Sequence, residues 1–558
     1  YDTIFKNATV VNHDGEGLAD IAVKDGKIVA LGTIAGDAAE VVDCKGLHIL
    51  PGVIDTQVHF REPGLTHKED LESGSLGAVM GGVTGVFEMP NTNPLTTTAE
   101  TFEAKIAAGT NRMHCDFAFY IGGTHENVGE LAVLEKLPGC AGVKVFMGSS
   151  TGSLLVQDDA GVEAILRAIS RRAAFHSEDE YMLEERKGLR VPGDPSSHPV
   201  WRSPEVAMSC TTRLVNLARK TGKRIHVLHI STKEEMVYLA EHKDVASVEV
   251  TPHHLTLDET AYTRLGTYAQ MNPPVRDKAH REGIWKGVEN GVADILGSDH
   301  APHTREEKDH AYPASHSGMT GVQTLVPTML DHVNAGKLSL QRFVDMTSHG
   351  PNRLFGIAGK GRIAVGYDAD LTIVDMKRRE TITNEWIRSR AGWTPYDGVE
   401  VTGWPVGTIS METAPIFYLI HEVGRAFRRQ LEDQTRGHDL TLPQWRIITK
   451  LGREDGMSQV ALASAIDTDP MTLSAILKRL SDRKLVRRKP DPQDGRAKIV
   501  TLTDEGLSLY RMVETLGTEL YKTAIAGMDK AETGGLVEGL AKIRDNLAGG
   551  DAETKDQV

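Results

Sequence analysis

Hydrophobic and polar positions divide the chain into segments of different periodicity. Residues 3–50 alternate short β-rich pieces with turns, including an Asp25-Gly26 pair that is typical of a β-hairpin. From 51 to about 355, short apolar strands alternate with helix-like segments, which predicts repeated βα units around a parallel sheet. Residues 362–375 are β-rich again. We therefore expect the two β-rich segments to pair in one small domain beside the βα repeats.

The pattern changes again after Ser410. Apolar residues at helical spacing predict an amphipathic helix there, with one face formed by Ile416, Leu419, Ile420, Val423 and Phe427. Most of the remaining tail is also predicted to be helical. The last residues, 551–558, have the polar composition of a disordered end.

Two short helices and a hairpin follow within the tail. Ser458 and Gln459 start the first helix, and Thr468 or Asp469 caps the second, with Pro470 in its first turn. The stretch RRKPDPQDGRAKIV then predicts a hairpin that turns around Asp494-Gly495. This order is typical of a helix-turn-helix followed by a wing.

Length and composition set the broad class. A chain of 558 residues is too long for one hydrophobic core, so we expect two or three domains. We find no apolar run near the roughly 20 residues of a membrane span, and no signal peptide. Four scattered cysteines without CxxC spacing indicate free thiols in the cytoplasm: Cys44, Cys115, Cys140 and Cys210.

Charge separates the tail from the rest. The net charge is −14, yet residues 470–503 carry nine Lys and Arg against three Asp. An acidic body with one basic patch indicates a small-molecule enzyme joined to a module that meets a polyanion. A solvated charged surface is the alternative on charge alone.

Polar residues directly after the apolar strands are the candidates for chemistry, because barrel enzymes place their sites at the C-terminal ends of strands. Six such places supply Gln57, His59, Lys144, His176, His226, His229, His253, His254, Asp299, His300 and His303. Imidazole and carboxylate ligands suit zinc and related divalent ions. Lys144 fits this set if its amine carries CO2 and so becomes a bridging carboxylate. A buried or salt-bridged lysine is the alternative.

Residues 1–409 resemble the amidohydrolase superfamily, and within it the dihydroorotases. The motifs that carry this resemblance are VHFREPG at 58–64, MPNTNP at 89–94, GVKVFM at 142–147, FHSED at 175–179, HIST at 229–232, NPPVR at 272–276 and SDHAPH at 298–303. The resemblance implies an α/β fold, namely a distorted (β/α)8 TIM-like barrel over 53–355. It also implies a composite flanking β domain formed by 1–52 and 356–409.

The resemblance further implies roles for individual residues. Lys144, as a carbamate, would bridge two zinc ions. The remaining metal positions are His176 and His229 for one ion, and His59 and Asp299 with Gln57 for the other. Arg61, Asn91 and His303 would bind a substrate carboxylate, and Asn272 would lie over the pyrimidine ring. Asp299 would act as general base and then as general acid.

Gln57 departs from the family pattern, in which histidine is expected. An amide oxygen is a poorer zinc ligand than imidazole. Three outcomes are open: one metal at Lys144, His176 and His229 with activity retained; two metals, the second bound weakly; or loss of hydrolysis. Because the predicted base and carboxylate clamp are present, we favour retained function. Arg61 and Asn91 favour dihydroorotase over allantoinase or hydantoinase.

The tail, over about 413–548, resembles the MarR family of winged-helix transcription regulators, most specifically in VRRKPDPQDGRAKIVTLTDEG. The resemblance implies double-stranded DNA as a partner, with the helix near 470–483 in the major groove. It also implies a homodimer built on the helices near 413–432 and 504–547. The DNA-contact candidates are Thr472, Ser474, Lys478, Arg487, Arg488, Arg496 and Lys498; a plain surface charge is the alternative for each Lys or Arg.

The join between the two parts is abrupt. The enzyme-like segment stops at WPVGTIS, and Met411 follows at once to open a regulator domain over 411–550. A natural fusion, a frameshift and an assembly artefact all fit this arrangement. We therefore predict a cytoplasmic, zinc-dependent dihydroorotase fused to a DNA-binding regulator. A metabolite-sensing barrel and an inactive scaffold remain the alternatives.

Overall fold

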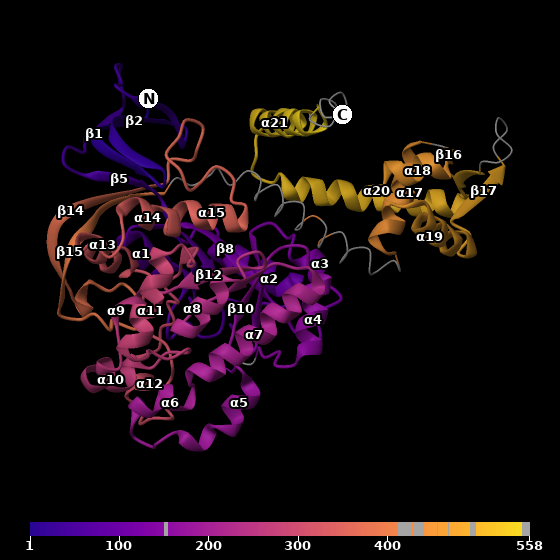
Figure 1. Ribbon diagram of the computed structural model, residues 1–558. Coiled ribbons are helices and arrows are strands. Elements are labelled where there is room, and N and C mark those ends of the chain that lie inside the picture. Colours follow the sequence, from indigo (N-terminus) through magenta and orange to yellow (C-terminus); the bar gives the residue numbers. More distant parts are fainter. Residues whose placement is uncertain are drawn as a thin grey trace. The chain divides into compact units, whose positions relative to one another are not determined.

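The chain forms two compact units, Tyr1–Thr413 and Ala414–Val558 (Figure 1). The structure, a computed structural model, describes residues 1–149, 154–410, 427, 430, 440–454, 456–466, 468–490 and 498–549. Within these residues, no helix has the length and apolar character that crossing a membrane requires.

Eight parallel strands form the centre of the first unit, in the order in which they occur along the chain. They are β6 (Val53–Val58), β7 (Val83–Glu88), β8 (Asp116–Gly122), β9 (Cys140–Phe146), β10 (Ala173–His176), β11 (Ile225–Val227), β12 (Ala246–Val250) and β13 (Ile295–Leu296). Most of these strands are buried along their whole length, as expected of a parallel sheet covered on both faces. A parallel bridge between Val58 and His300 joins the first strand to the end of the last. The predicted barrel fold is confirmed.

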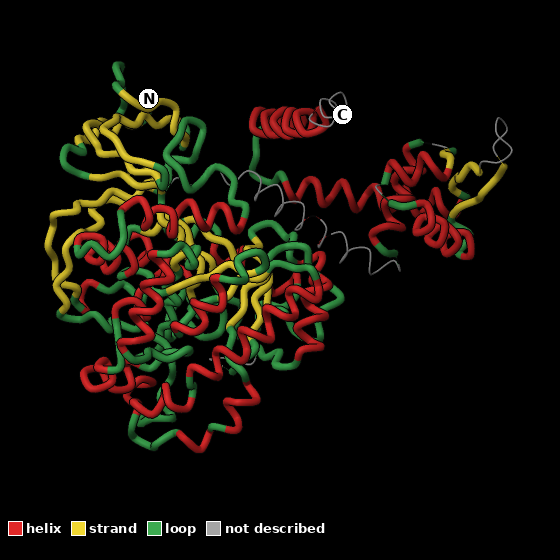
Figure 2. Tube along the Cα trace, in the orientation of Figure 1, coloured by secondary structure: helices red, strands yellow, loops and turns green. Residues whose placement is uncertain are grey.

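Helices surround the strands, which lie inside (Figure 2). The longer ones are α1 (Leu71–Met80), α2 (Ala99–Gly109), α4 (Asp159–Ala168), α7 (Pro204–Thr221), α8 (Lys233–Ala240), α11 (Lys278–Glu289) and α13 (Leu325–Asn334). Shorter ones are α3 (Leu131–Leu134), α5 (Glu180–Glu185), α6 (His198–Trp201), α9 (Pro252–Thr256), α10 (Thr260–Leu265), α12 (Arg305–Asp309), α14 (Leu340–Val344) and α15 (Gly350–Phe355).

A second sheet flanks the barrel and is built from both ends of this unit. Its strands are β1 (Thr3–Asn12), β2 (Gly15–Lys24), β3 (Lys27–Gly32), β4 (Glu40–Asp43), β5 (His48–Pro51), β14 (Leu371–Ile382) and β15 (Val399–Ile409). Asp25 and Gly26 connect β2 to β3 with φ of 50° and 72°, the left-handed geometry that a two-residue hairpin turn needs. Because β14 pairs with β5, the two β-rich segments share one sheet, as the sequence pattern predicts.

The second unit contains the predicted helix-turn-helix and wing. Its elements are α17 (Leu442–Arg453), β16 (Met457–Ser458), α18 (Gln459–Ala465), α19 (Pro470–Asp482), β17 (Val486–Pro490), β18 (Lys498–Leu502), α20 (Asp504–Ala524) and α21 (Lys530–Gly549). Ser458 caps α18, and Asp469 rather than Thr468 caps α19 by accepting from the backbone N–H groups of Met471 and Thr472. Leu473, Leu477 and Leu480 face the core.

Several predictions for the tail fall on residues outside the described part of the chain. These are the wing turn at Asp494-Gly495 with Arg496, the disordered end at 551–558, and all but Phe427 and Gln430 of the helix expected near 413–432. They remain predictions.

One buried ion pair links strand β7 of the barrel to helix α2. Glu88, at the end of β7, contacts Lys105 of α2, and the two side chains are almost completely buried. Lys105 Nζ also donates to the carbonyl of Met89 at 2.9 Å. Removing one partner of such a pair leaves an uncompensated charge in a low-dielectric interior, which costs far more than the pair itself contributes.

We therefore expect Lys105→Met to lower the free energy of unfolding of the first unit by about 3–5 kcal/mol. Replacing both partners, as in Glu88→Leu with Lys105→Met, should recover much of that loss. The measurement is urea denaturation followed by tryptophan fluorescence. Lys220→Met is the matched control, because Lys220 pairs with Glu163 at the surface and should contribute less than about 1 kcal/mol. Equal destabilisation by the two single variants would contradict the role given to the buried pair.

Candidate metal and substrate site

A small cavity of about 20 Å³ lies at the C-terminal ends of the barrel strands. Eight of the ten predicted barrel-site residues line it: Gln57, His59, Arg61, Asn91, His176, His229, Asn272 and Asp299. The other two lie beside it. Lys144 Nζ is 4.3 Å from the ring centre of Phe146, which lines the cavity, and His303 Nε2 is 3.3 Å from a terminal nitrogen of Arg61. The fold therefore gathers all ten residues at one place.

His176 and His229 present ring nitrogens to each other. His176 Nδ1 lies 3.1 Å from His229 Nε2, while His176 Nε2 lies 2.7 Å from a carboxylate oxygen of Glu178. Because a carboxylate accepts, His176 carries its hydrogen on Nε2 and turns the Nδ1 lone pair towards His229. Burial lowers the pKa of both histidines, which keeps them neutral. Two neutral imidazoles converging in this way are suited to a divalent cation.

Glu178 is a site residue that sequence reasoning missed, although it lies within the FHSED motif. It is fully buried, and it forms an ion pair with Arg202 as well as its bond to His176. A carboxylate behind a metal-ligating histidine fixes the tautomer and the orientation of the ring. The position two residues after His176 on an extended segment was the available signal.

His59 and Gln57 converge on Asp299. His59 Nδ1 donates to Asn91 Oδ1 at 2.8 Å, which leaves the His59 Nε2 lone pair 3.3 Å from Asp299 Oδ1. Gln57 Nε2 donates to the same carboxylate oxygen at 3.0 Å, and Gln57 Oε1 has no hydrogen-bond partner among the described residues. In this arrangement the amide of Gln57 holds Asp299 through a hydrogen bond. Burial raises the pKa of Asp299 to about 7, within range for proton transfer near neutral pH.

Lys144 is buried, and its amine has no polar partner among the residues that the structure describes. Its side chain is 1% exposed, and Nζ makes no hydrogen bond within the described part of the chain. Burial lowers its pKa to about 7, so a substantial fraction carries the lone pair that reaction with CO2 requires. The environment fits a modified lysine better than the salt-bridged lysine of the alternative interpretation.

Arg61 is the most unusual group of the site, because its charge is buried without an ion pair. The side chain is 2% exposed, and Nε donates to the carbonyl of Pro302 at 3.2 Å. One terminal nitrogen faces His303, and the other has no hydrogen-bond partner among the described residues. No described carboxylate lies within 4.0 Å of the guanidinium. Burying an arginine this way is costly unless an anionic ligand completes it.

His303 belongs to a second polar cluster with Glu307 and His316, whose possible ligand atoms lie within 4.8 Å of one another. Lys68 already supplies a cation there, with Nζ 2.9 Å from Glu307 Oε1 and 3.1 Å from His303 Nδ1. Lys68 therefore already supplies a positive charge to this group of possible metal ligands.

Asn272 is oriented by a short relay that the sequence did not reveal. His198 Nε2 lies 2.9 Å from both the carbonyl of Met271 and Asn272 Oδ1, so it donates to these acceptors. Its Nδ1 lies 3.4 Å from the Tyr312 hydroxyl, which donates to it. Burial lowers the pKa of His198 to about 3, so this tautomer stays neutral. The relay turns the amide nitrogen of Asn272 away from His198, as a donor.

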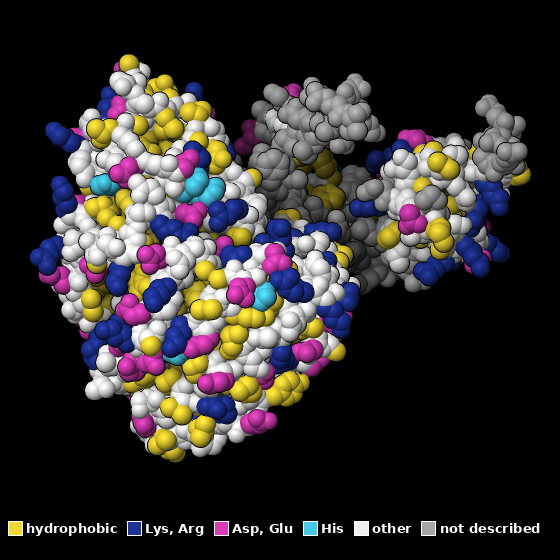
Figure 3. Space-filling view, viewed as in Figure 1, with side chains coloured by type: hydrophobic (Ala, Val, Ile, Leu, Met, Phe, Trp, Pro, Cys, Tyr) yellow, Lys and Arg dark blue, Asp and Glu magenta, His cyan; other side chains and the backbone are white. Residues whose placement is uncertain are grey.

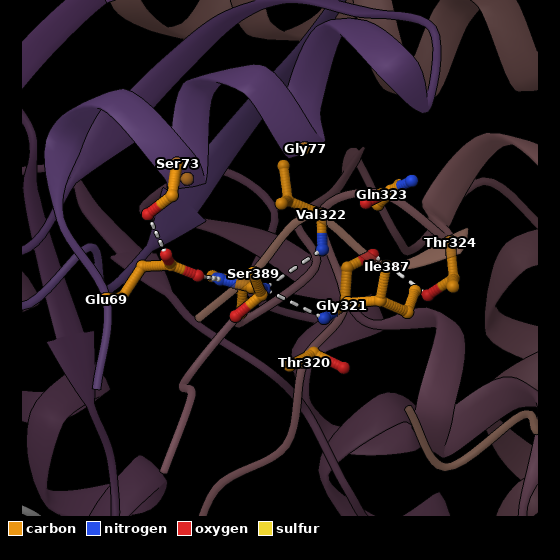
Figure 4. A pocket seen from close by; sticks show the side chains of 12 residues that line it. Glu69, Ser73, Gly77, Thr320, Gly321, Val322, Gln323, Thr324, Ile387 and Ser389 are labelled. Atoms are coloured by element: carbon orange, nitrogen blue, oxygen red, sulfur yellow. Dashed lines mark hydrogen bonds and ion pairs between the residues drawn. The ribbon is translucent and has the colours of Figure 1, made fainter. Parts of the chain in front are cut away.

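Three residues of the site have a strained backbone, and the ring of the adjacent His300 is held by hydrogen bonds. Arg61, His229 and Asp299 have φ of 63°, 36° and 47°, values that non-glycine residues adopt rarely and mostly at functional positions. His300 Nδ1 accepts from the backbone N–H groups of Gly321 and Val322, and its Nε2 donates to Glu69 at 3.3 Å. A separate small cavity is lined by Glu69, His300, Gly321 and Val322, and Glu69 also contacts Ser73 there (Figure 4).

The other histidines at strand ends do not line the cavity. His226 Nδ1 contacts Ser247 Oγ at 2.8 Å, and His254 contacts Thr251 and the carbonyl of Pro273. His253, adjacent to His254 in α9, is buried and its Nε2 has no partner among the described residues.

The DNA-contact candidates of the second unit lie on α19 and the wing. Thr472, Ser474 and Lys478 are exposed on α19, opposite its buried leucines. Arg487 and Arg488 are on β17, Lys498 is on β18, and Arg496 is outside the described residues. Lys and Arg side chains lie on the visible surface of this unit (Figure 3).

Comparison with known proteins gives a matching family for each of the two parts of the chain. Residues 48–411 match the amidohydrolase family, and residues 440–498 match the MarR family. The dihydroorotase of Methanosarcina mazei is 35% identical over 426 residues, covering 73% of this chain and 93% of that protein. The L-hydantoinase of Paenarthrobacter aurescens is 34% identical over 432 residues, with the same two coverages.

Solved structures agree with this result. The L-hydantoinase (dihydropyrimidinase) from Arthrobacter aurescens superposes with a TM-score of 0.70 at 31% identity, over 73% of this chain and 94% of that one. A D-hydantoinase gives 0.68 at 26% identity, over 74% and 94%. The chain belongs to the amidohydrolase family, and it carries a C-terminal MarR-type domain.

Proposed function

We propose that the barrel hydrolyses the ring amide of a cyclic substrate that bears a carboxylate, most specifically dihydroorotate, in a reversible reaction that forms N-carbamoyl-aspartate. The observation that carries this proposal is the buried guanidinium of Arg61, which has no ion pair among the described residues and lines the same cavity as the imidazoles. A planar carboxylate matches the fork of donors that arginine offers. Asn91 and His303 complete the clamp, and Asn272 supplies an amide donor beside the ring.

The residues at the strand ends fit a zinc centre. One side of this centre would consist of Lys144, as a carbamate, with His176 and His229. The other side would consist of His59 and Asp299. When bound, the metal supplies a water that ionises near neutral pH and polarises the amide carbonyl. Asp299 then takes a proton and delivers it to the leaving ring nitrogen. Gln57 donates to Asp299 through its amide N–H, and because it stands where the family pattern expects histidine, the second metal position would have one imidazole, that of His59, instead of two.

The similarity to hydantoinases supports a second candidate, the hydrolysis of hydantoins, and allantoin is a further ring of this type. The two candidate functions differ in the role that each gives to the positive charge of Arg61. A substrate with a carboxylate uses its charge, whereas a hydantoin without one leaves that charge buried and unpaired.

We expect the protein to hydrolyse dihydroorotate with a higher kcat/KM than dihydrouracil, which is the same ring without the carboxylate. Arg61→Gln should lower kcat/KM for dihydroorotate by about 10–100-fold, the loss of one charge-assisted contact of about 1.5–3 kcal/mol. The same variant should change dihydrouracil turnover much less, which makes that substrate the internal control. Equal losses on the two rings would contradict the clamp. Dihydroorotate binding without turnover would favour a sensor.

We also expect the native chain to retain about one zinc ion after dialysis, at the side formed by Lys144, His176 and His229. Gln57→His should raise this to about two by adding an imidazole beside His59. The measurement is metal content by mass spectrometry. His176→Ala is the matched loss-of-ligand variant and should remove the retained ion. Two tightly held ions in the native chain would contradict this assignment.

For the second unit we propose binding to double-stranded DNA as a regulator. Support comes from the match to the MarR family and from the exposed polar and basic residues on α19 and the wing. We further propose a homodimer formed through the terminal helices, since Leu536, Val537 and Leu540 are exposed on α21. A cytoplasmic location suits both activities.

Lys478→Gln and Arg487→Gln should each weaken binding to a generic DNA duplex and reduce the slope of log K against log salt by about 0.9, the loss of one phosphate contact. The measurement is fluorescence anisotropy over a salt series. Lys522→Gln is the control, because Lys522 pairs with Glu519 along α20. An unchanged slope in both the Lys478→Gln and the Arg487→Gln variants, or an equal loss in the control, would count against this surface.

A further inference from the structure

A second, larger cavity opens next to the site and has no role in the chemistry described above. Its volume is about 350 Å³, within the range of small-ligand pockets. Asn272 and Ser317 line both this outer cavity and the inner one, so the two adjoin. The outer walls come from the segment between α5 and α7 and from the segment after α12.

The outer cavity is electropositive. Arg190 and Arg202 line it, and each guanidinium lies over the ring of Trp201, at 4.9 and 4.8 Å from its centre. Glu178 neutralises Arg202. Arg190 donates through Nε to the carbonyl of Lys187 at 3.0 Å and forms no ion pair among the described residues. None of the described residues that line the cavity is acidic.

Polar groups with donor atoms also line the outer cavity. Arg202 is 2% exposed, and its Nε has no hydrogen-bond partner within the described part of the chain. Tyr312 and His316 contribute a hydroxyl and an imidazole to the walls. An arginine positioned over an indole ring can present its planar fork of terminal N–H groups to the two oxygens of a carboxylate.

We propose that this outer cavity is a second carboxylate-binding site, used by the ring acid on entry and by the ring-opened product on release. The inference rests on the proposed function for the identity of these ligands. Hydrolysis adds water across the ring amide, breaks the C–N bond and leaves a second carboxylate, so the product carries one more negative charge than the substrate. A cationic outer site therefore meets one carboxylate on the way in and two on the way out.

Binding can be tested without turnover, because Trp201 forms part of the wall. Malonate should change tryptophan fluorescence, malonamide should not, and Trp201→Phe should abolish the change. Arg190→Gln should weaken the Kd for malonate about tenfold through loss of one charge-assisted contact. Lys187→Gln is the matched control: Lys187 lies three residues away, pairs with Glu184 and does not line the cavity, so its removal should leave the Kd unchanged.

Arg61→Gln separates the two sites. It should leave the Trp201 signal and its Kd intact, because Arg61 serves the inner cavity. Loss of the signal in Arg61→Gln, the absence of any malonate response, or an unchanged Kd in Arg190→Gln would each overturn the proposal. Since these readouts do not depend on dihydroorotate hydrolysis, an inactive barrel with an Arg190-dependent malonate response would refute the proposed function and keep the outer site.

Discussion

The site depends on how the barrel closes between its first and last strands. Parallel strands place all their C-terminal ends at one mouth, but β13 is short, and the join is completed beyond it by the bridge between Val58 and His300. The N–H of His59 donates to the carbonyl of His300 at 2.7 Å. That single backbone contact sets His59 beside Asp299, and Glu69 holds the His300 ring from behind. Loss of this backbone hydrogen bond would move His59 away from Asp299, the predicted general base.

A hydrogen bond to one nitrogen of each imidazole ring then decides which nitrogen keeps its lone pair for the site. Glu178 takes the Nε2 hydrogen of His176, and Asn91 takes the Nδ1 hydrogen of His59. Each bond leaves the opposite ring nitrogen with a lone pair pointing into the site. Such hydrogen bonds fix the orientation of the imidazoles before a metal or substrate binds, which reduces the free-energy cost of assembling the site.

The sequence predicted the βα repeats, the shared flanking sheet and the helix-turn-helix with its wing from patterns of apolar positions and turns, and the barrel from the resemblance to a known family. It also named the strand-end residues that the cavity gathers. It could not show Glu178, His198 or Tyr312 as partners, since their contacts depend on ring orientation and on loops that meet only in the fold. It also offered His226 as a candidate, whereas the structure directs that ring to Ser247. Position at a strand end does not determine which face of the strand a side chain occupies.

Charge is the physical basis for the proposal that this mouth favours acids over neutral rings. Buried cations are tolerated when a partner neutralises them, as Glu88 does for Lys105 and Glu178 for Arg202. Arg61 lacks such a partner among the described residues, and so does Arg190, which is only partly buried; the two line adjoining cavities. A neutral ring would leave Arg61 buried and unpaired, whereas a ring acid supplies the missing charge. The same electrostatic argument supports a ring acid as the proposed substrate, and it requires no contact with the reacting amide.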